Sequence, residues 1–237
     1  MRILLIIIIL LGMSLQTPAT EGVVLLHGLC RRSGCMHKLE RALSAAGFQV
    51  ENVDYPSRTA TIDLLSELTI TEALRSPNLK ECSKIHFVTH SLGGILVRSY
   101  FKRHTSERLG RVVMLGPPNG GSEVVDRIGS WWLFRKLNGP AGQELGTDAA
   151  STPNRLGPVE FETGVIAGDQ SINWINSMMI RGKNDGKVSV ERTKVAGMKD
   201  HVTIHATHPF LMKNREAIKY TIRFLQTGAF ALKPNDE

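Results

Sequence analysis

The sequence has few of the features from which disulfide-rich, metal-binding or disordered proteins are built. Its 237 residues include three cysteines, and 42% are hydrophobic against 22% charged. These proportions are close to those of ordinary globular proteins, so they exclude a disulfide-dense miniprotein, a collagen-like repeat and a disordered chain. Neither a C-x-x-C pair nor a His/Cys cluster with zinc-ligand spacing occurs, so we expect no structural metal site.

The chain also lacks internal repeats, low-complexity linkers and a second long apolar run. Its length is that of one α/β domain with a large buried core. The 29 Lys and Arg residues exceed the 22 Asp and Glu residues, which gives a net charge of +7. This charge is compatible with an anionic partner such as a membrane surface. Because no nucleic-acid motif and no interleaving of basic with aromatic residues is present, nucleic acid is not expected as a partner.

The N-terminus departs from this even composition. Met1 and Arg2 precede an apolar run that extends from Ile3 to Met13, and the small residue Ala19 follows. A short basic start, an apolar stretch of about ten residues and a small residue are typical of a secretory signal peptide. Spanning a bilayer takes about 20 apolar residues. We therefore expect residues 1–19 to be a signal peptide and the protein to be periplasmic or secreted; an uncleaved anchor and a buried strand are the alternatives.

Export would place the cysteines in an oxidising compartment. Cys30 and Cys35 are close enough in the sequence to form a disulfide, which would leave Cys82 alone. Spacing does not decide the pairing, so this disulfide and three buried or semi-buried thiols both remain open.

Strand and helix patterns alternate along most of the chain. Strand patterns cover residues 23–26, 48–55, 85–88, 111–115 and 164–168, and helical spacing of apolar residues covers 33–46, 61–74, 92–104 and 209–226. This alternation predicts right-handed βαβ units, and therefore an α/β fold with a mostly parallel sheet and helices on both faces. Residues 119–158 contain no strand pattern. We interpret them as a cap inserted into a domain that spans residues 20–237.

One short segment has the pattern of a catalytic nucleophile. Residues 88–94, Val-Thr-His-Ser-Leu-Gly-Gly, join a predicted strand to a predicted helix. A serine on such a sharp turn needs small residues two positions before and after it, and its hydroxyl is exposed beside the N–H groups of the helix. Gly93 fits this pattern, whereas Thr89 stands where glycine is usual. Ser91 is therefore the candidate nucleophile, and His90 is expected to pack behind it.

An earlier turn supplies a second donor for an oxyanion. His27, Gly28 and Leu29 end the first predicted strand. Where a serine occupies a sharp strand-to-helix turn, a His-Gly turn after an earlier strand lies beside it. The backbone N–H groups of Leu29 and Leu92 are therefore the expected oxyanion hole. We expect His27 to hold the loop rather than to act as a base. Residues 31–32, both arginines, either are solvated or contact an anionic head group.

A serine hydroxyl is a weak nucleophile until a base accepts its proton. Three late histidines compete for this role. His208 lies in the turn before the last predicted helix, where it would face the ends of the strands, and it is favoured over His205 and His201.

The base in turn needs an acid that fixes its tautomer. Asp185 lies in an Asn-Asp-Gly turn, followed by a strand-like stretch at residues 187–190. It is favoured over Asp169, which follows the strand pattern at 164–168 and is also a good helix N-cap. An ordinary Asp-Gly turn is the structural alternative for Asp185.

Together, the segments VVLLHGL, THSLGG, MLGPPNGGSE, KNDGKVSVE and THPFLM resemble those of small bacterial α/β-hydrolases described as lipase- or esterase-like serine hydrolases. The resemblance extends over residues 22–226. It implies an α/β-hydrolase fold in which Ser91 is the nucleophile, Asp185 the acid and His208 the base. Neither a metal nor an organic cofactor is required by this scheme.

We therefore expect an exported serine hydrolase that cleaves carboxylic esters, of lipids or of short acyl groups, through an acyl-enzyme. A bulky stretch with Trp131, Trp132 and Phe134 would line the acyl pocket or contact lipid, or would simply pack as a cap helix on the core. An acyltransferase with the same triad and a non-catalytic binding module on the same fold are the competing functions. The presence of all three triad candidates argues against the binding module.

Overall fold

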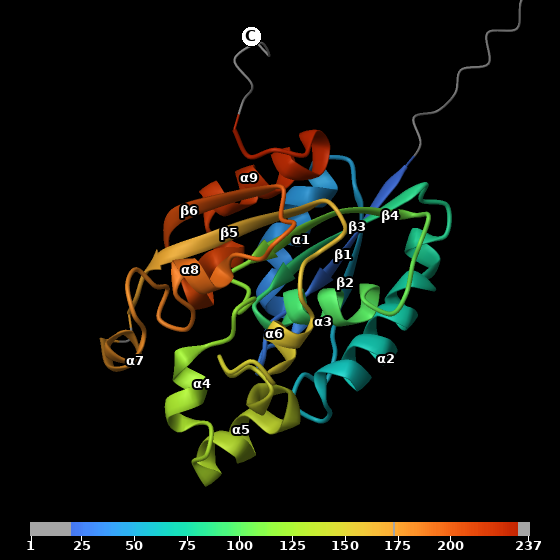
Figure 1. Ribbon diagram of the computed structural model, residues 1–237. Coiled ribbons are helices and arrows are strands. Elements are labelled where there is room, and N and C mark those ends of the chain that lie inside the picture. The colour runs from blue at the N-terminus through green and yellow to red at the C-terminus, as the bar shows by residue number, and fades with distance from the viewer. Residues whose placement is uncertain (1–19, 173, 232–237) are drawn as a thin grey trace, which may run out of the picture.

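The computed structural model describes residues 20–172 and 174–231. The predicted signal peptide, residues 1–19, lies outside the described residues. The sheet has six strands in the order β2-β1-β3-β4-β5-β6, and all neighbouring strands are parallel (Figure 1). The strands are β1 Glu21–Leu26, β2 Gln49–Val53, β3 Lys84–His90, β4 Leu109–Leu115, β5 Thr163–Gln170 and β6 Asp200–Thr207.

Helices follow most strands along the chain. The α-helices are α1 His37–Ala45, α2 Ile62–Leu74, α3 Leu92–Phe101, α4 Glu123–Ile128, α5 Trp132–Gln143, α6 Thr152–Arg155, α7 Trp174–Met179, α8 Val190–Thr193 and α9 Arg215–Thr227. Three short 3₁₀ helices are η1 Ser33–Met36, η2 Pro77–Leu79 and η3 His208–Lys213. None of the helices in the described ranges has the length and apolar character of a membrane span.

Both faces of the sheet are buried. Successive side chains of a strand point to opposite faces, so Val24 and Leu26 of β1 pack into one core with α2 and α3, whereas Val23 and Leu25 pack into a second core with α1 and α9. A parallel sheet is stable only when both faces are covered in this way. The predicted parallel sheet with helices on both faces is confirmed.

The segment between β4 and β5 contains α4, α5 and α6. The bulky stretch expected around residues 124–134 is divided between two helices, because the helical structure is interrupted between α4 and α5. A second break lies inside α5, where Gly139 has a φ of 65° and Pro140 follows. In Figure 1, α4 and α5 lie beyond the end of the sheet toward which the strand arrows point.

Two local expectations were wrong. Residues 187–190 do not form a strand: an isolated antiparallel bridge joins Asn184 to Ser189 and closes a turn, and α8 starts at Val190. The expected helix at 209–226 is split, because the side chain of Asn214 caps α9 by accepting hydrogen bonds from the backbone of the next turn. The residues before Asn214 form η3 instead, with a proline in its first turn.

The three cysteines are unpaired. Cys30 is exposed, Cys35 is partly buried and Cys82 is buried. The structure therefore has free thiols, but the alternative of three buried or semi-buried thiols holds only for Cys35 and Cys82, because Cys30 is exposed.

Candidate active site

Ser91 occupies the sharp turn that joins β3 to α3. Its φ of 52° and ψ of −117° place it in a region that non-glycine residues rarely adopt. Such a conformation costs of order 1–3 kcal/mol and is usually retained at functional sites. The N–H of Ser91 donates to the carbonyl oxygen of Leu115, at 2.9 Å, which ties the turn to β4. The serine lines a cavity of about 320 Å³ at the ends of the strands.

Glycines let two loops approach this turn closely. A Cβ on Gly93 would lie 2.7 Å from the carbonyl oxygen of Leu26, and a Cβ on Gly28 would lie 3.1 Å from the Cβ of Ser91. The loop after β1 therefore lies against the nucleophile turn. Within the described residues, the N–H groups of Leu29 and Leu92 have no hydrogen-bond acceptor, so both are free to donate to a developing oxyanion.

Thr89 occupies the position two residues before the serine, where a glycine is usual. It is accommodated there because Gly94, which packs against it, has no side chain. Its side chain is fully buried, and its Oγ1 lies 3.3 Å from the position that a Cβ on Gly94 would take. The larger residue before the serine is thus compensated by the small residue after it.

Asp185 and His208 form a buried acid–base pair. The Oδ2 of Asp185 accepts a hydrogen bond from the Nδ1 of His208 at 2.7 Å. Its Oδ1 accepts from the N–H groups of Lys187 and Val188, at 3.0 and 2.9 Å, so both carboxylate oxygens are held in place. The backbone N–H of His208 also donates to the carbonyl oxygen of Asp185, at 3.0 Å. With Nδ1 engaged, the Nε2 of His208 is the atom left for proton transfer, and His208 lines the same cavity as Ser91.

His90 supports this histidine from behind. Its Nε2 donates to the carbonyl oxygen of His208 at 3.0 Å, and the two rings lie 4.8 Å apart. Burial, and to a lesser extent the nearby His208, lowers the pKa of His90 well below its usual value. A neutral His90 holds the backbone of His208 without adding charge beside it. The expectation that His90 packs behind the serine agrees with this geometry.

Gly116, at the end of β4, is a site residue that sequence reasoning missed. Its φ is 55°, and a Cβ at this position would lie 3.0 Å from the Oδ2 of Asp185 and 3.2 Å from the Nδ1 of His208. Only a residue without a side chain leaves room for the acid–base pair here. The signal available in the sequence was the glycine directly after a predicted strand, but nothing linked it to Asp185.

His27 holds the loop after β1, as expected. Its Nδ1 donates to the carbonyl oxygen of Gly28 at 2.9 Å, and its Nε2 accepts from the N–H of Tyr55 at 3.3 Å. Its ring stacks on that of Tyr55 at 4.1 Å. Burial lowers the pKa of His27, so a neutral ring with both nitrogens engaged is a loop support and not a base.

The rival acid and base pair with each other, away from the cavity. The Nδ1 of His205 lies 2.9 Å from the Oδ1 of Asp169, and the side chain of His205 is 73% exposed. The third candidate, His201, lies 3.0 Å from the hydroxyl of Thr193. None of these side chains lines the cavity that contains Ser91.

Polar and apolar side chains both line the cavity. Ser91 and His208 are among the polar ones, and Val124, Val125, Phe134 and Leu145 are among the apolar ones. Of the three aromatic residues expected to bind substrate, Phe134 lines the cavity. Trp131 and Trp132 lie on the outer surface at the start of α5 and are 62% and 72% exposed.

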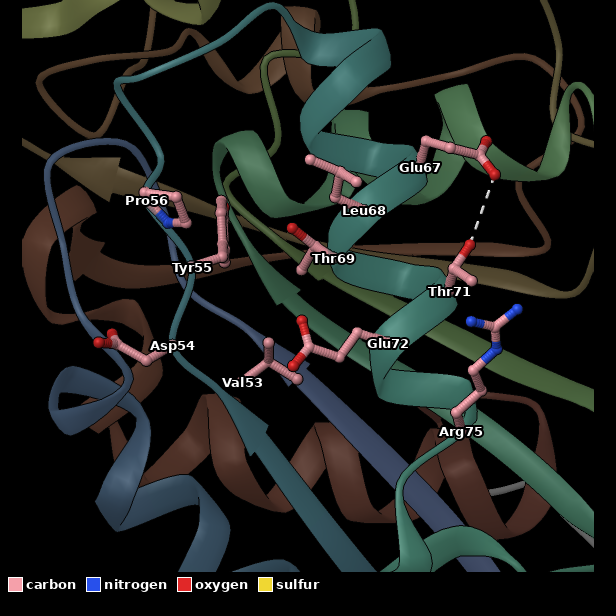
Figure 2. Close-up of a pocket in the computed structure, with 10 residues that line it drawn as sticks. All are labelled: Val53, Asp54, Tyr55, Pro56, Glu67, Leu68, Thr69, Thr71, Glu72 and Arg75. Carbon is pink, nitrogen blue, oxygen red and sulfur yellow. Dashed lines mark hydrogen bonds between the residues drawn. The ribbon is translucent and has the colours of Figure 1, made fainter.

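A second cavity, of about 650 Å³, lies between α2 and the chain after β2 (Figure 2). The close-up shows Glu67, Glu72 and Arg75 along α2, opposite Asp54. Neither the serine at the sharp turn nor the buried acid–base pair lines it. The smaller cavity is therefore the candidate active site.

Comparisons with known proteins agree with the fold. A family model described as the alpha/beta hydrolase family matches residues 23–180. No curated protein matches the chain.

Solved structures share the fold. The mature form of the Bacillus licheniformis lipase BlEst2 matches with a TM-score of 0.73 and 21% identity, over 90% of this chain and 93% of that one. The phospholipase PlaB from Legionella pneumophila, in complex with thio-NAD, matches with a TM-score of 0.65 and 17% identity, over 87% and 62%. A thermophilic esterase from Thermogutta terrifontis matches with a TM-score of 0.59 and 15% identity, over 89% and 91%.

Proposed function

The chain belongs to the alpha/beta hydrolase family, and from that premise we propose that it is a serine hydrolase that cleaves carboxylic esters. One observation carries the proposal. His208, whose Nδ1 lies 2.7 Å from the Oδ2 of the buried Asp185, lines the same cavity as a serine in a strained strand-to-helix turn. A nucleophile and a base in one cavity, with an acid that orients the base, are the components of acyl transfer.

The reaction follows from these positions. His208, held by Asp185 through Nδ1, accepts the proton of the Ser91 hydroxyl as the oxygen attacks the ester carbonyl. The N–H groups of Leu29 and Leu92 stabilise the oxyanion of the tetrahedral intermediate. The proton then passes from His208 to the departing alcohol, which leaves an acyl group on Ser91. Water, activated by the same histidine, hydrolyses the acyl-enzyme and restores the serine.

The walls of the cavity favour an acyl chain as one part of the substrate. Apolar lining residues, among them Val124, Val125 and Phe134, would remove the hydrocarbon of an acyl chain from water. At about 320 Å³ the cavity is at the small end of the range for ligand sites, about 300–1,000 Å³. We therefore favour esters of short or medium acyl chains. The lipase, phospholipase and esterase structures among the neighbours support an ester substrate.

The outer surface of α5 favours contact with lipid. Trp131, Trp132, Leu133 and Leu137 are each about half exposed or more, and aromatic side chains of this kind are enriched where proteins meet membrane interfaces. We propose that this surface, which is part of the cap formed by residues 119–158, contacts an anionic membrane. The sequence of residues 1–19 further supports export to the periplasm or the medium.

A matched set of variants tests the proposed triad. Hydrolysis of 4-nitrophenyl butyrate should fall at least about a thousandfold in Ser91→Ala and His208→Ala. His205→Ala is the control, because it removes a histidine that is also paired with an aspartate but lies outside the cavity. Full activity of His208→Ala, or loss of activity in His205→Ala alone, would show that His208 is not the base. An added primary alcohol distinguishes hydrolysis from acyl transfer, because a transferase would release the ester of that alcohol.

A further inference from the structure

The charged side chains that line the active-site cavity are all cationic. Arg31 and Lys187 line the cavity, and among the described residues that line it none is an Asp or a Glu. The cavity beside α2 in Figure 2 is different: Asp54, Glu67 and Glu72 line it together with Arg75. A cationic lining is therefore a property of the reactive cavity and not of every hollow on the molecule.

Within the described residues, neither cation forms an ion pair. Several other arginines pair with carboxylates, such as Arg103 with Asp63 at 2.7 Å and Arg192 with Glu123 at 2.9 Å. In the described part of the chain no ion pair and no side-chain hydrogen bond involves the guanidinium of Arg31 or the ammonium of Lys187.

Both cations are fixed to the loops that carry the catalytic groups. The N–H of Arg31 donates to the carbonyl oxygen of Gly28 at 3.3 Å, in the turn that presents Leu29. The N–H of Lys187 donates to the carboxylate of Asp185 at 3.0 Å. The two side chains therefore start from backbone positions set by the oxyanion loop and by the catalytic acid.

The surroundings of Lys187 favour an anion beside it. Although much of its side chain is exposed, the protein atoms around the ammonium displace water and lower the pKa of Lys187. A bound anion would offset this loss of hydration. The nearby Asp185 does not serve as that partner, because its carboxylate oxygens are taken up by His208 and by backbone N–H groups.

We propose that the preferred substrate is an ester whose alcohol part carries a negative charge, a phosphate or a carboxylate, and that Arg31 and Lys187 bind this group. This inference rests on the proposed ester hydrolysis. In this assignment the acyl chain packs against Val124, Val125 and Phe134, and the charged part of the substrate meets Arg31 and Lys187, which line the same cavity. Water is the only co-reactant: it adds to the acyl carbon, and the products are a carboxylic acid and the anionic alcohol.

A pair of esters that differ only in charge tests the proposal. The probes are 1-octanoylglycerol and 1-octanoylglycerol 3-phosphate, both kept monomeric, with released octanoate as the readout. The ratio of kcat/KM for the charged over the neutral ester should exceed one in the natural protein. In Lys187→Glu and in Arg31→Glu this ratio should fall about tenfold or more, mainly through KM of the charged ester. Lys187→Arg should preserve it.

The neighbouring arginine is the control. Arg32 is 88% exposed, lies 3.5 Å from Asp54 and does not line the cavity, so Arg32→Glu should leave the ratio unchanged. Because the ratio is internal to each variant, it cancels a general loss of activity. Vesicles of phosphatidylglycerol and of phosphatidylcholine form a second arm: preference for the anionic vesicles assigns the charge to a lipid head group in a bilayer, and preference for the soluble phosphate alone assigns it to a monomeric ester.

The possible failures are distinguishable. A ratio near one in the natural protein, or a ratio that Lys187→Glu and Arg31→Glu leave unchanged, overturns the inference and leaves ester hydrolysis intact. If neither ester is hydrolysed and a fluorophosphonate does not label Ser91, the proposed function itself is wrong.

Discussion

Replacing Gly116 with alanine should damage the acid–base pair directly. The new Cβ would lie 3.0 Å from the Oδ2 of Asp185, 3.2 Å from the Nδ1 of His208 and 2.7 Å from the Cδ1 of Leu211. A left-handed backbone costs alanine about 1–2 kcal/mol, and overpacking costs a further 1–3 kcal/mol or so. We expect the free energy of unfolding to fall by about 2–5 kcal/mol. We expect kcat/KM to fall about a hundredfold, because a shift of a catalytic group by about 1 Å has an effect of that size.

Gly157→Ala separates backbone strain from contact. Gly157 also has a positive φ, 69°, but a Cβ there would meet nothing within 4 Å. Urea unfolding would give the stability of both variants, and kcat/KM of an activated ester would be measured where both are folded. Gly157→Ala should lose stability through strain and keep its kcat/KM. If the two variants lose kcat/KM to the same extent, the contact of Gly116 with the Asp185–His208 pair has no catalytic role.

Two further predictions concern stability and membrane contact. Burial lowers the pKa of His27, His86 and His90 below the ordinary value of 6.5, so below that pH the unfolded chain binds protons that the folded protein does not. The free energy of unfolding should therefore decrease from pH 7 toward pH 5, by up to about 1.4 kcal/mol per pH unit for each histidine; a flat profile in urea titrations would contradict this. Replacing Trp131 and Trp132 with serine should weaken co-sedimentation with phosphatidylglycerol vesicles about tenfold for each residue, and unchanged sedimentation would exclude α5 as the lipid contact.

The sequence predicted the region around Ser91 well because each local signal there agrees. The strand β3 is an apolar run, the helix α3 starts directly after the serine, and Gly93 meets the steric requirement of the turn. The His208 turn was found for a similar reason, since a histidine before the last helix faces the ends of parallel strands. Patterns of this kind depend on residues that are adjacent along the chain, so they can be recognised in a single sequence.

The predictions from the sequence were wrong where a side chain, and not another backbone group, accepts the hydrogen bonds of backbone N–H groups. Residues 187–190 alternate like a strand, yet the N–H groups of Lys187 and Val188 donate to the carboxylate of Asp185 and not to a neighbouring strand. The helix expected at 209–226 was split by the side chain of Asn214, which caps α9. In both cases a polar side chain competes with regular hydrogen bonding, and periodicity does not reveal which will win.

Contacts between segments that are distant in the sequence could not be predicted either. Gly116 meets Asp185 and His208 only because the loops that follow β5 and β6 reach the end of β4. Arg31 and Lys187 face one cavity for the same reason. Spacing along a single sequence does not show such pairs, since the sheet order that unites them is a property of the folded chain.

The most direct test of the account is the identity of the residue that reacts as the nucleophile. A fluorophosphonate probe, followed by mass mapping of the labelled peptide, should give one adduct, on Ser91. Labelling should be absent in Ser91→Ala, slowed about 10⁴-fold in His208→Ala and unchanged in His205→Ala. An adduct on another residue, or equal labelling of Ser91→Ala, would contradict the assignment of this cavity as the catalytic site.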